Sequence, residues 1–105
     1  MSLRNVSGNW SLHQSNGPTV TFTINPHGLA GSSALIDGVA KYSDDSGIAK
    51  GSVTDGSFVY TVSWSKGPKG EYSGNFNNDG RLTGITFDLH NPGNQATWFS
   101  NKVFS

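Results

Sequence analysis

Hydrophobic and polar residues alternate most regularly between positions 57 and 65. Phe58, Tyr60, Val62 and Trp64 share one side of this segment, and the residues between them are mostly serine and threonine. Side chains of a β-strand change face at every residue, so a repeat of two predicts a half-buried strand with an aromatic inner face. We expect that face to line either a packed core or a ligand pocket, and the function depends on which.

Shorter alternating segments recur along the chain, and none repeats with the 3.6-residue period of a helix. They predict further strands over residues 8–13, 19–24, 29–36, 39–42, 48–54, 71–76, 81–89 and 95–104. Clusters of glycine, proline, asparagine and aspartate predict turns at residues 15–18, 25–28, 37–38, 43–47, 55–56, 66–70, 77–80 and 90–94. The same alternation assigns Trp10, Leu12, Val20, Phe22 and Ile24 to inner faces.

Strands joined by such short turns form an antiparallel meander. Closing a meander into a barrel removes its exposed edges. The sequence therefore predicts one all-β domain over residues 1–105, an up-and-down antiparallel barrel of about eight strands. An open sandwich is the alternative.

Composition narrows the function. The net charge is zero and only 13% of the residues are charged, so we expect neither a nucleic-acid partner nor a membrane partner. The chain has no cysteine, which excludes disulfides, thiolate metal sites and cysteine nucleophiles. No segment is long and apolar enough for a transmembrane helix. The expected location is cytoplasmic, or secreted after removal of a signal peptide.

Four short motifs follow one another in a characteristic order. They are Gly8-Asn9-Trp10, Val62-Ser63-Trp64, Ser73-Gly74-Asn75, and Ala96-Thr97-Trp98-Phe99-Ser100 with Phe104 shortly after. In order and spacing they resemble the avidin and streptavidin family over almost the whole chain. The resemblance implies a ligand-binding barrel in which Trp64 lines the pocket. It also implies a homo-oligomer in which Trp98 is lent to a neighbouring subunit's pocket.

The chain departs from that family where biotin is held. Ser11-Leu12-His13-Gln14 stands where the family's first strand supplies the hydrogen bonds to the ureido oxygen. Lys102 falls near the position of the family's aspartate. A bicyclic urea binds tightly only when its polar atoms all find placed partners, so biotin itself is not the expected ligand.

A second resemblance starts from Ser7-Gly8-Asn9-Trp10. This opening strand is similar to that of the small β-barrel inhibitors of bacterial metalloproteases. Those inhibitors plug the protease with an N-terminal segment, so this alternative requires a mobile, projecting N-terminus.

Catalytic and metal-binding chemistry has little support in the sequence. His27 and His90 lie in predicted turns, where we expect solvated side chains, and His13 adds no ligand spacing. Asp44-Asp45 lacks the further acidic ligands of a calcium loop. No nucleophile elbow, phosphate loop or paired carboxylate spacing occurs. We therefore expect a protein that is not an enzyme and that needs no cofactor or metal.

The resulting interpretation is a barrel that binds a small molecule or saccharide at one open end. The candidate contacts are Trp64, Trp98, Tyr42, Thr86 and Asp88. Asp88 is included because it interrupts an apolar strand on the face opposite Phe87. A carbohydrate-binding lectin is the main alternative. A pocket binder should enclose its aromatic side chains, whereas a lectin should present them on its outer surface.

Overall fold

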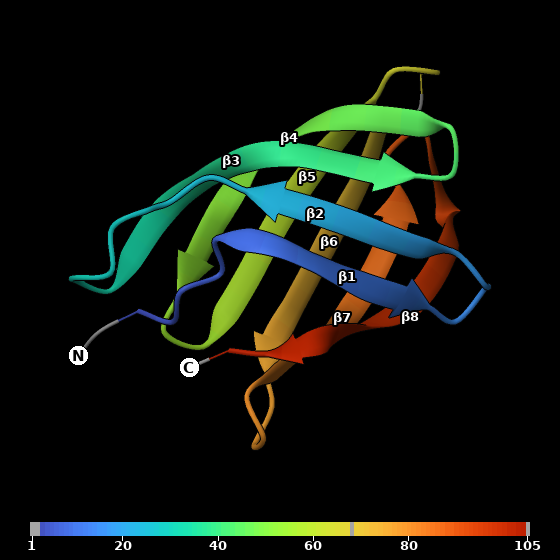
Figure 1. Cartoon of the computed structure of the whole chain (residues 1–105). Helices are drawn as coiled ribbons and strands as arrows, with labels where there is room; N and C mark the ends of the chain where they lie inside the picture. The colour runs from blue at the N-terminus through green and yellow to red at the C-terminus, as the bar shows by residue number, and fades with distance from the viewer. Residues whose placement is uncertain (1–2, 68, 105) are drawn as a thin grey trace.

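The computed structural model describes residues 3–67 and 69–104. They form a closed antiparallel barrel in which each strand pairs with the next and β1 pairs with β8 (Figure 1). The strands are β1 (Gly8–Gln14), β2 (Thr19–Ile24), β3 (Ser33–Tyr42), β4 (Asp45–Thr54), β5 (Ser57–Trp64), β6 (Lys69–Phe76), β7 (Arg81–Asp88) and β8 (Asn91–Val103). The predicted all-β, up-and-down barrel of eight strands is confirmed. No helix in the described part of the chain is long and apolar enough to cross a membrane.

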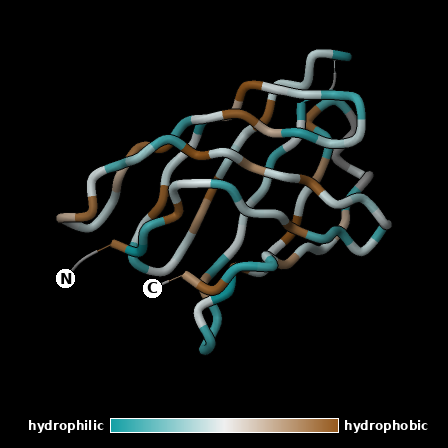
Figure 2. Tube along the Cα trace, viewed as in Figure 1, coloured by the Kyte–Doolittle hydropathy of each residue, from teal (hydrophilic) through white to brown (hydrophobic). Residues whose placement is uncertain are grey.

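Aromatic rings fill the interior. Phe22 of β2 lies at their centre, with ring centroids 5.2 Å from Trp10, 5.0 Å from Tyr60 and 5.3 Å from Tyr72, all edge to face. Edge-to-face contacts stabilise aromatic pairs beyond their buried area. The inward positions predicted from the alternation on β1, β2 and β5 are buried, except that Trp64 at the end of β5 is half-buried. Figure 2 shows the hydrophobic positions interspersed with hydrophilic ones along the strands.

The segment before β1 closes one end of the barrel, which we call the closed end. Leu3 and Val6 are buried there, and the Val6 carbonyl accepts a hydrogen bond from Trp10 Nε1 at 3.0 Å. Arg4 donates to the carbonyl of Phe104 at 2.7 Å and stacks over the Phe76 ring. Both chain ends therefore lie at this end (Figure 1).

His27 helps to hold that segment. The backbone N–H of Val6 donates to His27 Nε2 at 3.1 Å, so this nitrogen carries no proton. The proton is then on Nδ1, which donates to the carbonyl of Gly28 at 2.8 Å. The histidine that was expected to be solvated is instead half-buried, and hydrogen bonds at both ring nitrogens hold it in place.

The predicted boundaries around β3 were wrong. Residues 29–32 are not a strand, and the expected turn at Asp37-Gly38 lies in the middle of one continuous strand paired with β4. The glycine has a different purpose. A Cβ at Gly38 would lie 2.0 Å from the carbonyl oxygen of Thr23, so its absence lets β2 approach closely.

Three turns are shorter than predicted. The β3–β4 turn consists of Ser43 and Asp44, with Ser43 at a φ of 53°, so Ser46 and Gly47 belong to β4. The turn expected over residues 90–94 is reduced to residues 89–90, since β8 begins at Asn91. The turn expected over residues 66–70 ends where β6 begins at Lys69, and Pro68 lies outside the described residues.

The buried hydroxyl of Tyr60 generates a stability prediction. It has no hydrogen-bond partner among the described residues, and burial raises its pKa strongly. Removing an unsatisfied buried hydroxyl relieves its desolvation cost. We expect Tyr60→Phe to leave the free energy of unfolding in urea unchanged or to raise it by about 1 kcal/mol.

Tyr72→Phe is the matched control, because the Tyr72 hydroxyl is satisfied by Gln14. Its loss should lower stability by about 1 kcal/mol. A loss of this size in Tyr60→Phe as well would contradict the assignment of an unpaired hydroxyl.

Candidate ligand-binding site

The end opposite the N-terminal segment, which we call the open end, holds a cavity of about 440 Å³. Strands β1, β5, β6, β7 and β8 surround it. By their alternation the inward side chains include Gln14, Trp64, Tyr72, Thr86, Asp88 and Ala96. A volume of this size lies within the usual range for small-molecule sites.

A hydrogen-bonded network forms the floor. Tyr72 and Thr86 are buried cross-strand partners, and the Tyr72 hydroxyl donates to Gln14 Oε1 at 3.0 Å. The Gln14 amide in turn donates to Asn16 Oδ1 at the rim. Burial raises the pKa of Tyr72 to about 12, an effect that its hydrogen bond with Thr86 partly offsets. The phenol therefore stays protonated at neutral pH and keeps this network fixed.

One wall of the cavity is hollowed at Gly70. This residue pairs with Asp88 on one side and with Val62, two residues before Trp64, on the other. A Cβ at Gly70 would lie 3.6 Å from Tyr72 Cε1 and 3.7 Å from Trp64 Nε1. The missing side chain thus leaves open space beside the indole and the carboxyl group.

Trp64 differs from the other tryptophans in its hydrogen bonding. The indole N–H groups of Trp10 and Trp98 donate to the carbonyls of Val6 and Ile85. Trp64 is half-buried, and its indole N–H makes no hydrogen bond within the described residues. It is the tryptophan with a donor left for a ligand.

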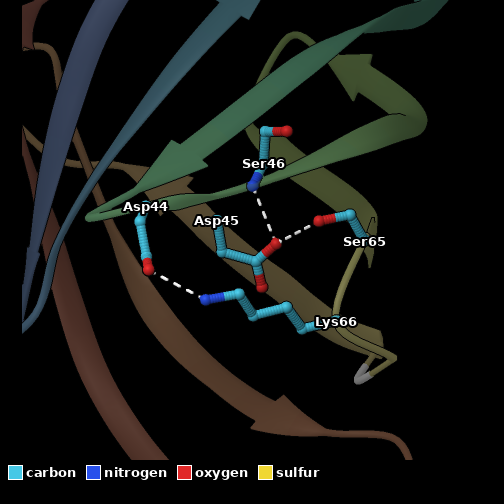
Figure 3. Close-up of polar contacts among 5 residues, drawn as sticks. All are labelled: Asp44, Asp45, Ser46, Ser65 and Lys66. Atoms are coloured by element: carbon cyan, nitrogen blue, oxygen red, sulfur yellow. Dashed lines mark hydrogen bonds and ion pairs between the residues drawn. The ribbon is translucent and has the colours of Figure 1, made fainter.

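Hydrogen bonds tie the start of β4 to Ser65, the residue that follows the end of β5 (Figure 3). The carboxylate of Asp45 accepts hydrogen bonds from the Ser65 hydroxyl and from the Ser46 N–H, and the Ser65 N–H donates to the Ser46 carbonyl. Hydrogen bonding from Ser65 is the main reason why the pKa of Asp45 is lowered. These contacts fix the strand end that carries Trp64.

The remaining acidic residue of this loop is also engaged. Lys66 Nζ lies 3.0 Å from Asp44 Oδ1 in an exposed ion pair, a kind that contributes little to stability. Within the described ranges, no group of three or more histidine, aspartate or glutamate side chains could hold a metal ion.

Three of the five predicted contacts meet in the cavity: Trp64, Thr86 and Asp88. Asp88 is half-buried, and its Oδ1 accepts the N–H of His90 at 2.8 Å. Tyr42 lies at the same end of the barrel but on β3, which does not border the cavity.

Trp98 is not where the resemblance implied. It is 2% exposed inside its own barrel, so it is not available to a neighbouring subunit. Its backbone partner is Gly84, and a Cβ at Gly74 would lie 3.0 Å from its ring. The indole packs against the space that the missing side chain of Gly74 leaves.

Gln14 and Tyr72 are the residues that the sequence interpretation missed. Gln14 continues the inward positions of Trp10 and Leu12, and a polar residue at the end of such a series is the available signal. Nothing local connects it with Tyr72, because β1 and β6 meet only across the closed barrel.

Comparison with solved structures finds another β-barrel of similar fold. The chain is similar to a redesigned β-barrel, mFAP1, bound to DFHBI, with a TM-score of 0.53 and 12% sequence identity over 90% of this chain and 91% of that one. At this identity the likeness shows a shared fold alone. No protein-family model matched the chain, and a search of curated proteins found no match either.

The Asp45 contacts should respond to acid. The pKa of Asp45 is lower in the folded protein than its ordinary value of 3.8. The ionised carboxylate therefore stabilises these contacts fully at pH values above 3.8, and this contribution is lost as the pH falls through the lower folded pKa. We expect the Ser46 and Ser65 amide NMR signals to hold constant from neutral pH down to that region and to shift below it.

Asp45→Asn should shift both signals already at neutral pH and remove the acid transition. Asp55→Asn, in the exposed β4–β5 turn, is the control that should leave the transition intact. A transition that persists in Asp45→Asn would assign it to another group.

Proposed function

We propose that this protein binds a small polar organic molecule in the cavity at the open end and catalyses no reaction. The observation that carries the proposal is the combination of a preformed cavity, a fixed polar floor at Gln14 and Tyr72, and an indole at the wall whose N–H is free. Specific sites for small molecules combine apolar surface with a few placed polar groups in this way. Binding of DFHBI by mFAP1 supports the proposal only as an analogy of fold.

The positions of the aromatic side chains favour a pocket over a lectin surface. Trp10, Tyr60, Tyr72 and Trp98 are buried, and Trp64 faces the cavity. The exposed aromatic residues Tyr42 and Phe99 lie on β3 and β8, which are not neighbours in the barrel. They offer no joint platform on which a sugar ring could stack.

The structure of the closed end argues against the alternative of a protease inhibitor. Residues 3–7, which would have to project as a plug, contain two buried side chains and a network of hydrogen bonds to His27, Leu29 and Phe104. A binding role without catalysis is favoured because the described lining of the cavity holds one carboxylate, that of Asp88, and no histidine that could form an acid–base pair with it.

Filling the cavity provides the test. Gly70→Leu should occlude it, since the Cβ fits at ordinary contact distance and the larger side chain extends into the open space. Amide NMR titrations with DFHBI, biotin and simple hexoses should show saturable shifts at Gln14, Gly70 and Thr86 for at least one probe. Gly70→Leu should abolish them, and Trp64→Ala should weaken binding about tenfold or more.

Gly56→Leu is the matched control, in a turn at the closed end where a Cβ meets nothing within 4 Å. It should bind as the unmodified protein does. Hexose binding that survives Gly70→Leu would favour a lectin with an outer-surface site. Failure of every probe to shift the cavity amides would contradict the proposal.

A further inference from the structure

We infer that the ligand of the open-end cavity carries a positively charged nitrogen, such as an ammonium or amidinium group. This inference rests on the proposed function and narrows its ligand class. Asp88 would pair with the charge in the space that Gly70 leaves open.

The first step is the charge that faces the cavity. Two of its lining residues are charged, Asp88 and Lys69. Strand alternation directs Asp88 inward together with its partner Gly70, whereas Lys69 follows the outward register of its partner Ser63 and is exposed. The interior of the cavity is therefore negative, although its rim carries a lysine.

The second step is that the carboxylate has no counter-ion. Among the described residues the one ion pair is that of Lys66 with Asp44, so no described cation lies within 4 Å of Asp88. Its Oδ1 accepts the His90 N–H, and its second oxygen makes no hydrogen bond to the described chain. A half-buried carboxylate is costly without a partner, and a ligand cation would supply one through a charge-assisted hydrogen bond.

The third step is the open space beside that carboxylate. Gly70 lies between the strand end of Trp64 and Asp88, and it leaves room for a ligand group that touches both. The Tyr72 hydroxyl at the floor is already engaged, because it donates a hydrogen bond to Gln14 and is also hydrogen-bonded to Thr86. The group beside this space that lacks a partner of opposite charge is therefore the carboxylate of Asp88, which favours a cation and disfavours an anion.

Three probes of one shape test the inference: benzylamine, which is protonated at neutral pH, benzyl alcohol and benzoate. Calorimetric titration should show benzylamine binding at least tenfold tighter than benzyl alcohol, with no binding of benzoate. Asp88→Asn should weaken benzylamine about tenfold and leave benzyl alcohol unchanged, which is the size expected for a charge-assisted hydrogen bond. Asp55→Asn, on an exposed turn, is the control that should change nothing.

Each contrary result is decisive. The inference is overturned if benzyl alcohol or benzoate binds as tightly as benzylamine. It is also overturned if Asp88→Asn leaves benzylamine binding unchanged, or if benzylamine does not bind. Preference for benzoate would assign recognition to Lys69. Failure of the proposed function gives a different result from failure of this inference. If the proposed function fails, Gly70→Leu changes the binding of no ligand, whatever its charge.

A different observation, on the outer surface, carries a second proposal: two copies of the chain associate through the outer face of β3 and β4. Three large aliphatic side chains are exposed there, Leu35 at 86%, Ile48 at 66% and Val39 at 50%. Val39 and Ile48 are cross-strand partners beside a hollow of about 250 Å³ at Gly47. Exposed apolar surface of this kind is typical of interaction sites.

The charges on this face suit a second copy of the same chain. Asp37 and Lys50 are paired on adjacent strands, and no ion pair joins them among the described residues. A two-fold axis that runs along the strands between β3 and β4 places Asp37 of one copy opposite Lys50 of the other, twice. The same axis places Val39 opposite Ile48, so the face complements itself as a two-fold interface requires.

A charge swap tests this arrangement in sedimentation equilibrium experiments. We expect a dimer at high protein concentration. Asp37→Lys and Lys50→Asp should each raise the dissociation constant of the dimer at least tenfold. The double variant, in which the two charges are exchanged, should restore dimer formation. Glu71→Lys, on the outer face of β6, is the control. A monomer at all concentrations, or a dimer insensitive to either single charge reversal, overturns the proposal, and circular dichroism checks that each variant is folded.

Discussion

The structure depends on matching side-chain volumes across neighbouring strands inside a closed barrel. An eight-strand barrel has just enough interior for side chains to fill. Strand β5 supplies large ones, and the inward positions of β4 opposite them are small: Gly51 pairs with Tyr60, and Gly47 pairs with Trp64. At Gly51 a Cβ would lie 1.8 Å from the carbonyl oxygen of Val59. The glycine therefore lets β4 approach the backbone of β5 closely at the position that carries the Tyr60 ring.

The two ends of the barrel differ because the chain covers only one of them. At the closed end the N-terminal segment satisfies the Trp10 indole and buries Val6 against the core. At the open end Trp64 has no comparable cover, and the glycine beside it adds space. The same residue type is thus a core element at one end and a cavity wall at the other, and the difference lies in what covers it.

Much of the fold could be predicted from alternation alone, since β1, β2 and β5 carry a regular apolar inner face. The errors arose at glycines. The sequence Asp37-Gly38 suits a turn, but close approach by β2 makes the glycine necessary within a strand. Trp64, Thr86 and Asp88 could be found because each is inward-facing near a strand end. Gln14 could not, because its partner Tyr72 comes near only when the barrel closes. The motif resemblance misplaced Trp98 because it takes no account of Gly74, which makes room for the indole inside the barrel.

The hydrogen bond from Arg4 to the carbonyl of Phe104 brings the first and last parts of the chain together on the side away from the cavity. Anything joined before Arg4 or after Phe104, whether a neighbouring domain, a solid support or a label, would therefore leave the barrel at the end opposite the cavity. The barrel can be attached to a surface through either end of the chain without covering the cavity. The cavity would then stay in contact with solvent in either order of fusion.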